Sequence, residues 1–132
     1  MIEISQLTTN QGEFRLKNID LYIEDGGFFV LMGPTGAGKT VLLEAIAGLV
    51  PVTGGRITIG GRDITHLPPE KRGVSIVYQD YALFPHLTVD QNITFGLRYR
   101  QHNKEKTQKV YDRLVDVLGI NHLLRRHPPT LS

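Results

Sequence analysis

The chain contains no cysteine, carries little net charge and has no long apolar run. The lack of cysteine in its 132 residues excludes disulfides and thiolate metal sites, and it allows a cytosolic setting. Fifteen Lys and Arg against thirteen Asp and Glu leave a formal charge of +2, which is too small to favour nucleic acid or anionic lipid as a partner. The longest mostly apolar stretch, residues 41–50, is short and contains Glu44, so we expect no membrane span, and we see no signal peptide. The remaining composition, with 40% hydrophobic residues, suits one globular domain or part of one.

What the chain does have is a glycine-rich loop between an apolar segment and a helical pattern. The run Gly33-Pro34-Thr35-Gly36-Ala37-Gly38-Lys39-Thr40 fits the pattern G-x-x-x-x-G-K-[ST] at every fixed position. The apolar residues 28–32 before it predict a buried parallel strand, and residues 41–47 after it predict a helix. This order is typical of a phosphate-binding loop. The alternative, a glycine-rich turn that holds no ligand, needs all the fixed positions to coincide by chance.

Each residue type in the loop suits a polyphosphate. Glycines at 33, 36 and 38 let the backbone take positive φ, so that N–H groups point inward with no Cβ in the way. The first helical turn, from about Gly38 to Val41, adds unpaired N–H groups and the positive end of the helix dipole. Lys39 is predicted to reach the β- and γ-phosphates, and Thr40 to offer its hydroxyl to Mg²⁺. The sequence therefore predicts a nucleoside triphosphate and one Mg²⁺ as ligands.

A small antiparallel β layer is predicted ahead of the loop. Apolar residues alternate over 1–6 and over 14–23, where Asn18 interrupts the alternation and indicates a bulge. Residues 56–61 predict a hairpin. Phe14 has two roles open to it: it could stack on adenine, or it could be a core residue, which its alternating strand position favours.

A second apolar segment ends on polar residues. Residues 73–78 predict a strand that delivers Gln79 and Asp80 at its C-terminal end, where open α/β sheets keep their ligands. Position alone leaves Gln79 as either a site residue or a polar residue that closes a strand.

The last part of the chain predicts helices. Thr88 and Gln91 have the spacing of a capping box and predict a helix over about 89–99. Asn103 can cap a further helix that ends at Gly119, and a short helix is predicted over 120–126. The longer helix has one predicted apolar stripe: Val110, Leu114, Val117 and Leu118.

Together these residues resemble the ATP-binding cassette, the nucleotide-binding subunit of ABC transporters. Beyond the loop, the resemblance is carried by LPPEKRGV at 67–74, VYQDYALFPHLTV at 77–89 and NITFGL at 92–97, and it covers the entire chain. These runs resemble the importer branch. The loop followed by LLEAIAG at 42–48 is most similar to the ATPases of molybdate and tungstate importers.

The resemblance implies an α/β fold: a P-loop NTPase core with an N-terminal antiparallel β layer and the start of a helical subdomain. It places the ATP-binding part at 1–80 and the Q-loop with a partial helical subdomain at 81–132. The implied activity is ATP hydrolysis coupled to uptake of a solute such as molybdate, tungstate or another oxyanion. The implied location is peripheral, at the cytoplasmic face of the membrane.

The same resemblance implies roles for individual residues and partners. Gln79 would be the Q-loop glutamine, which senses the γ-phosphate and Mg²⁺ and joins Thr40 at the metal. Residues from Tyr81 to His86 would line the groove that receives a coupling helix of the membrane-spanning permease subunit. A second ATPase subunit would join head to tail, with no nucleic acid and no direct contact with the solute.

The sequence departs from the family pattern in two places. Gln11 stands where the family has its adenine-stacking aromatic, just before Gly12, so Phe14 is the candidate substitute. Leu131-Ser132 match only the start of the L-S-G-G-Q signature. The acidic Mg²⁺ strand, the catalytic glutamate, the switch histidine and the strands that normally flank residues 28–32 are absent. We therefore expect the front half of an ATPase domain, which does not hydrolyse ATP by itself.

Two other classes of protein share some of these features. In another P-loop kinase or GTPase, Asp80 would be the acidic Mg²⁺ ligand, but neither lid arginines nor guanine-reading motifs are seen. A non-transport cassette that acts as an ATP switch on nucleic acid conflicts with the near-neutral charge and with the importer-like run over 78–89.

Overall fold

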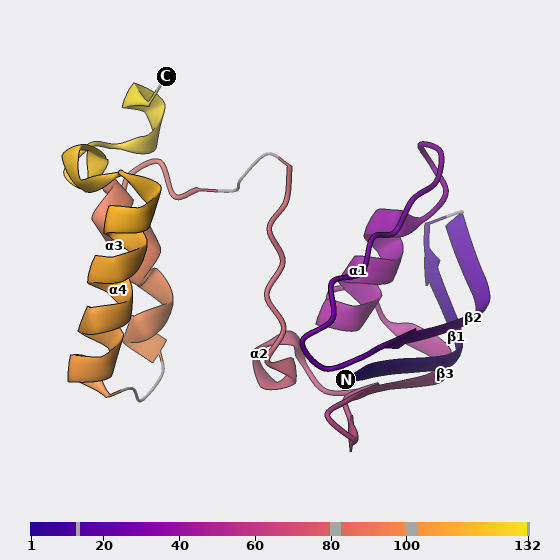
Figure 1. Cartoon of the computed structure of the whole chain (residues 1–132). Helices are drawn as coiled ribbons and strands as arrows, with labels where there is room; N and C mark the ends of the chain where they lie inside the picture. The colour runs from indigo at the N-terminus through magenta and orange to yellow at the C-terminus, as the bar shows by residue number, and fades with distance from the viewer. Residues whose placement is uncertain (13, 80–82, 100–102, 132) are drawn as a thin grey trace. The chain divides into compact units, whose positions relative to one another are not determined.

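The computed structural model describes residues 1–12, 14–79, 83–99 and 103–131 (Figure 1). The chain divides into two compact units, Met1–Val77 and Tyr78–Ser132. Each unit has its own helices and its own packing.

The first unit is built on a four-stranded antiparallel sheet with strand order β2-β1-β3-β4. Its strands are β1 (Ile2–Gln11), β2 (Phe14–Ile23), β3 (Val52–Ile59) and β4 (Arg62–Asp63). The pairing of β1 with β2 shifts register on both sides of Leu7, and Gln6 and Asn18 take positive φ of 51° and 52°. The predicted β layer, its irregularity near Asn18 and the 56–61 hairpin are therefore confirmed.

The core of this unit lies between the sheet and helix α1 (Lys39–Ala47), which covers one face (Figure 1). The sheet and the segment after it contribute the buried residues Ile4, Leu7, Leu16, Ile57 and Ile64, and the helix contributes Leu42, Ala45 and Ile46. Burying an aliphatic side chain of this size contributes about 1.5–3 kcal/mol. The helix stops at Gly48, which takes φ 86° as the C-cap, so the predicted helix and its end are confirmed.

The two parallel strands predicted over 28–32 and 73–78 are not formed. Neither segment is in a strand, and the described strands pair only with one another. Phe28, Met32 and Val77 are 96%, 84% and 85% exposed, so the expectation of a buried strand before the loop was wrong. The reason is that a β-strand takes its hydrogen bonds from a neighbour. No described strand pairs with residues 28–32, so this segment has no such neighbour.

The second unit is helical. It contains α3 (Val89–Thr94), η1 (Phe95–Tyr99), α4 (Lys104–Leu118), η2 (Asn121–Leu123) and η3 (Pro128–Thr130). The Thr88 capping box is complete: its hydroxyl accepts from the N–H of Gln91 at 3.2 Å, and its own N–H donates to Oε1 of Gln91 at 2.9 Å. The helix predicted over 89–99 becomes a 3₁₀ helix at Phe95, and the helix predicted over 120–126 shortens to the 3₁₀ turn η2.

Helix α4 begins and ends as predicted but is hardly buried. Asn103 accepts from the N–H of Lys106 at 3.0 Å, and Gly119 takes φ 66° at the C-cap. Val115 is buried. The predicted apolar stripe is between 52% and 75% exposed at Val110, Leu114, Val117 and Leu118.

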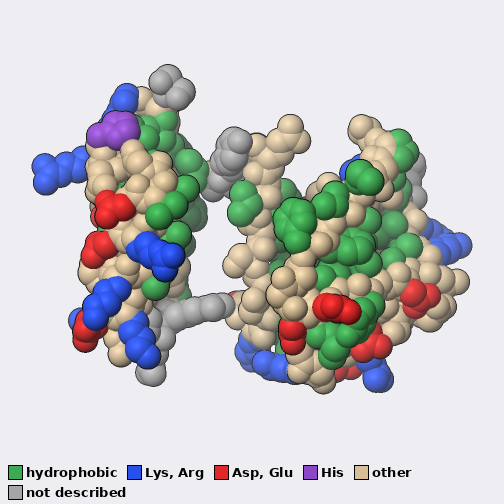
Figure 2. All heavy atoms as spheres, in the orientation of Figure 1, with side chains coloured by type: hydrophobic (Ala, Val, Ile, Leu, Met, Phe, Trp, Pro, Cys, Tyr) green, Lys and Arg blue, Asp and Glu red, His purple; other side chains and the backbone are tan. Residues whose placement is uncertain are grey.

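Figure 2 shows hydrophobic side chains at the surface of both units. No helix in the described part of the chain combines the length and the apolar character needed to cross a bilayer.

A short helix, α2 (Pro69–Arg72), follows the hairpin in the first unit. Pro69 occupies its first position, where the missing N–H costs nothing, and Gly73 ends it with φ 70°. Its last residue, Arg72, is buried against α1.

Candidate phosphate-binding site

The glycine-rich loop over 33–40 runs directly into α1. Gly36 and Gly38 take φ of 83° and 86°, so the positive φ predicted at these two glycines is found. Gly33 is not among the positive-φ glycines, and a Cβ placed there would only touch Ala37 at an ordinary 3.5 Å. The expectation of positive φ at Gly33 was wrong, because the left-handed conformation begins at Gly36, inside the turn that the Ala37 N–H and the Pro34 carbonyl close.

The start of α1 is left without a side-chain cap. Gly38 is the N-cap, and because glycine has no side chain it supplies no cap hydrogen bond; its carbonyl accepts the first helical bond from Leu42 at 2.9 Å. The N–H groups of Lys39, Thr40 and Val41 therefore have no acceptor within the helix. Together with the helix dipole, they make the start of α1 suitable for an anion.

The Lys39 side chain folds back over the loop. Its Nζ donates to the carbonyls of Gly33 and Pro34, at 2.7 Å each, while a turn from the Ala37 N–H to the Pro34 carbonyl at 3.2 Å closes the loop beneath it. A positive charge is thus held against the first two residues of the loop. The exposed Thr40 follows directly on the same helical turn.

Phe14 lies against the loop from the sheet side. A Cβ placed on Gly38 would lie 2.6 Å from Cε1 and Cζ of the Phe14 ring and 2.8 Å from Cδ2 of Leu16. Phe14 is half-buried and packs against the core. This contact gives Phe14 a packing role beneath Gly38, one of the two roles that the sequence leaves open; adenine stacking by Phe14 stays a prediction.

Gln11 connects the end of β1 to α1. Its Nε2 donates to Oε2 of Glu44 at 3.2 Å, and the next residue, Gly12, takes φ 59°. The sequence marked Gln11 only as a departure from the aromatic of the family. The contact shows that an amide at this position can reach the side of the loop helix.

An apolar hollow of about 540 Å³ lies beside the loop in the first unit. Lys39 and Thr40 line it together with residues 28–31 and with apolar residues of β2 and α1. Its apolar lining does not suit phosphates. Residues 28–31, which form no strand, contribute to this lining.

The remaining predicted site residues belong to the second unit. Gln79 is exposed near the start of that unit, and Asp80, Tyr81 and Ala82 lie outside the described residues. The Q-loop role of Gln79 and the alternative Mg²⁺ role of Asp80 therefore stay predictions.

Of the predicted permease-facing segment, residues 83–86 are described, and Leu83 and Phe84 are 49% and 40% exposed. Asn92 holds this segment in place. Its Oδ1 accepts from the Phe84 N–H at 2.9 Å, and its Nδ2 donates to the carbonyls of Phe84 and Leu87 at 3.1 and 3.2 Å. The Phe84 ring packs on Phe95 with centroids 4.4 Å apart. Sequence reasoning missed Asn92, because an asparagine inside a predicted helix gives no sign of the loop that it bonds.

Comparison with known proteins identifies the family. The family model described as ABC transporter matches residues 16–132. The chain therefore belongs to the ABC transporter family. Its fold is that of an α/β ABC ATPase domain, of which it contains the antiparallel sheet, the loop helix and helices of the second unit.

Several curated relatives are similar over nearly the whole chain. The molybdate/tungstate import ATP-binding protein WtpC of Thermococcus kodakarensis is 46% identical over 132 residues, which are 100% of this chain and 40% of that protein. The sulfoquinovosyl glycerol transport ATP-binding protein SmoE of Agrobacterium fabrum is 42% identical over 99% of this chain and 37% of its own length. The putative 2-aminoethylphosphonate import ATP-binding protein PhnT of Salmonella typhimurium is 46% identical over 92% and 33%. The chain thus spans 40% or less of these relatives.

Two solved structures have the same fold. The ATP-binding cassette MJ0796, in a dimeric post-hydrolysis state bound to ADP and Pi, matches with a TM-score of 0.77 and 27% identity, over 100% of this chain and 63% of that one. The protein cbiO1 of Clostridium perfringens, part of the ABC transporter complex cbiONQ, matches with a TM-score of 0.75 and 25% identity, over 99% and 55%.

Proposed function

We propose that the full-length protein is the ATP-binding subunit of an ABC importer and couples Mg-ATP binding and hydrolysis to the uptake of a solute. The proposed solute class is molybdate, tungstate or another oxyanion, in line with the name of the Thermococcus relative. The observation that carries the proposal is the loop itself. Its glycines at 36 and 38 take positive φ, the Lys39 amine lies on the loop carbonyls, and the start of α1 has no side-chain cap, in a chain 46% identical throughout to an import ATP-binding protein.

The residues present fit Mg-ATP. Residues 33–41 form the loop and the first turn of α1, whose N–H groups have no side-chain cap. Gly38 has no room for a Cβ beside the Phe14 ring. Lys39 would exchange its two carbonyl contacts for phosphate oxygens, which are stronger acceptors because they are charged. Thr40 and Gln79 would hold Mg²⁺, whose charge offsets that of the phosphates when it is bound.

The proposal includes partners and a location. The permease subunit would bind at residues 81–86, and a second ATPase subunit would pair head to tail, as the dimeric state of MJ0796 supports. The protein would lie peripherally at the cytoplasmic face of the membrane. Leu83 and Phe84 are large apolar residues of this segment that are exposed and available for the permease contact, and apolar loop residues of this kind often mark a partner.

The 132 residues alone are proposed to bind nucleotide weakly and not to hydrolyse it. Lys39, Thr40 and Gln79 can hold phosphate and metal in the ground state. Hydrolysis also needs a group that positions water and groups that stabilise the charge that develops in the transition state. We propose that the full-length protein supplies those groups from later residues and from the second subunit.

Titration of the full-length protein with Mg-ATP tests the proposed nucleotide site. Lys39→Ala should weaken binding by at least about tenfold, since a charge-assisted hydrogen bond contributes about 1.5–3 kcal/mol. Lys17→Ala, which removes an exposed lysine of β2, should leave affinity unchanged. Equal affinity in the wild type and in Lys39→Ala would exclude the loop as the nucleotide site.

The permease contact is tested separately, by co-purification of the subunits. Leu83→Asp should reduce assembly with the permease while ATP affinity stays at the wild-type level. Phe84→Asp should act in the same way but also disturb the ring contact with Phe95, so Leu83→Asp is the cleaner variant. Full assembly and normal solute-stimulated ATPase activity in both variants would remove this surface from the proposal.

A further inference from the structure

Arg72 is a buried arginine at the far end of the loop helix. It is 8% exposed and is the last residue of α2. Its Nη1 donates to the carbonyls of Ala45 and Ile46 at 2.8 and 3.1 Å, both in the last turn of α1. Its Nε donates to the Leu67 carbonyl at 2.6 Å, and its Nη2 donates to the Thr65 carbonyl at 2.9 Å. One guanidinium therefore joins α1 to the segment that follows the hairpin.

The position of this guanidinium suits the helix end in two ways. The last carbonyls of a helix receive no hydrogen bond from N–H groups of that helix. They also form the negative end of its dipole. A planar, charged guanidinium supplies both hydrogen bonds and positive charge there. Burial lowers the pKa of Arg72 from its ordinary value, yet an arginine still carries its charge at neutral pH.

Gly48 leaves the space that Arg72 occupies. A Cβ at Gly48 would lie 2.5 Å from Nε and 2.8 Å from Cζ of Arg72. The glycine that ends α1 therefore serves two purposes: it takes φ 86°, and it lets the guanidinium approach the helix end.

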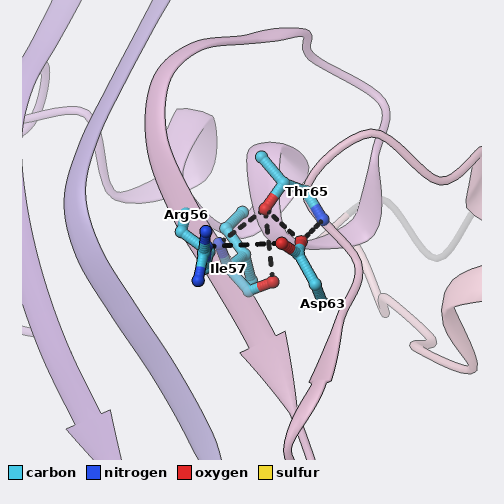
Figure 3. Close-up of polar contacts among 4 residues, drawn as sticks. All are labelled: Arg56, Ile57, Asp63 and Thr65. Atoms are coloured by element: carbon cyan, nitrogen blue, oxygen red, sulfur yellow. Dashed lines mark hydrogen bonds and ion pairs between the residues drawn. The ribbon is translucent and has the colours of Figure 1, made fainter.

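The segment that accepts from Arg72 is itself fixed to the sheet (Figure 3). The buried Thr65 accepts from the N–H of Ile57 at 2.9 Å through Oγ1, and the same hydroxyl donates to Oδ1 of Asp63 at 2.6 Å. Asp63 also pairs with Arg56 of β3 at 3.3 Å. Arg72 thus connects the end of α1 to the β3-β4 hairpin and not to a free loop.

Helix α1 is consequently held at both ends. Phe14 and Leu16 lie beneath Gly38 at its start, and Arg72 holds its last turn. We propose that Arg72 is a positioning residue for the nucleotide site, an inference that rests on the nucleotide role proposed above. It fixes where α1 lies along its own axis, and so where the N–H groups, Lys39 and Thr40 meet the phosphates.

Binding of Mg-ADP to the full-length protein, well below the melting temperature of each variant, tests this role. Arg72→Met removes the donors and keeps most of the side-chain length, and it should raise the Kd at least about fivefold, because small misplacements of a preorganised site are costly. Arg72→Lys, which keeps the charge but not the planar set of donors, should fall between Arg72→Met and the wild type. Arg62→Met, at an exposed arginine of β4, should stay within about twofold of the wild type.

Amide hydrogen exchange supplies a second measurement. Arg72→Met should speed exchange in α1 selectively, relative to β1 and β3. If Arg72→Met does not fold, Arg72→Lys compared with Arg62→Lys gives the same test at smaller amplitude, and a higher Kd for Arg72→Lys alone supports the role.

The outcomes separate this inference from the proposed function. A folded Arg72→Met variant with a lower melting temperature but wild-type Mg-ADP affinity would show a purely structural arginine and overturn the inference. In that case, a loss of affinity in Lys39→Ala would still support the nucleotide site. Absence of binding by the wild-type protein would overturn both.

Discussion

Helices α1 and α4 differ in what holds them. Helix α1 has nine residues, no side-chain cap and four buried residues: Leu42, Ala45, Ile46 and Ala47. Helix α4 has fifteen residues and buries only Val115, but it has the Asn103 cap and a Glu105–Lys109 ion pair at 2.8 Å. Burial against the sheet stabilises α1, whereas α4 depends mainly on interactions within itself, on its caps and on the hydrogen bond from Tyr111 to Asp90 of α3. The difference matters for the proposed function. A side chain that capped the start of α1 would occupy the N–H groups that the proposed anion needs.

Truncating one leucine on each helix tests this difference most strongly. Leu42→Ala should destabilise the 132-residue chain by about 2–4 kcal/mol, because it leaves a cavity in the core of the first unit. Leu114→Ala should cost less than about 1 kcal/mol, because Leu114 is 52% exposed. Urea denaturation followed by far-UV circular dichroism measures both. Equal losses would mean that the apolar stripe of α4 is covered in solution.

The two glycines at helix ends should also respond differently to alanine. Gly38→Ala should cost about 2–3 kcal/mol, since the new Cβ meets the Phe14 ring at 2.6 Å in addition to the strain of positive φ. Gly119→Ala should cost about 1 kcal/mol, because φ is 66° there but nothing lies within 4 Å of the new Cβ. The same denaturation experiment compares them. Phe14→Leu combined with Gly38→Ala should recover part of the loss if the ring contact is its cause.

Removing the cap of α4 probes the local interactions on which that helix depends. Asn103→Ala should cost about 1 kcal/mol, because the Lys106 N–H loses its acceptor. Asn103→Ser, which keeps an acceptor, should recover most of this loss. Hydrogen exchange resolved by residue would show the effect in the first turn of α4. Uniform exchange changes in both units would contradict a local origin.

The smallest expected effect is a change in how the stability of the second unit depends on pH. The Tyr111 hydroxyl donates to Oδ1 of Asp90 at 2.5 Å, and this hydrogen bond, followed by burial, raises the pKa of Tyr111 from 10.0 to about 12. Because the folded pKa lies above the unfolded one, the stabilisation is complete below pH 10 and is lost as pH rises from about 10 through about 12. Ultraviolet titration of the phenols should show one late step that Tyr111→Phe removes. An unchanged titration curve in Tyr111→Phe would contradict the shift.

Patterns within a few residues predicted most of the local structure. The alternation of β1 and β2, the Thr88 capping box and the glycine stops at 48 and 119 all lie where the sequence placed them. These features depend on neighbours in the chain, so a single sequence contains the information. The positive φ at Gly36 and Gly38 belongs to the same class.

Features that depend on distant partners could not be predicted in the same way. Residues 28–32 have the composition of a buried strand, but no described segment pairs with them, so their pattern did not decide their structure. Arg72 follows Pro68-Pro69 in a short charged stretch to which the sequence assigned no contact, and only the fold brings its guanidinium to the end of α1. Which carbonyls a long side chain reaches is a property of tertiary packing.

The core of the first unit has a consequence for synthesis of the protein. All of its buried members lie between Ile4 and Ile64, so the sheet and α1 can close while the ribosome is still adding later residues, at about 5–20 per second. During that interval the apolar residues 28–32 stay exposed beside a sheet and a helix α1 that have already folded, with Phe28 96% exposed. A nascent chain in this state offers holding chaperones a short, fixed apolar segment, and slower translation beyond residue 64 would lengthen the time for which it is vulnerable.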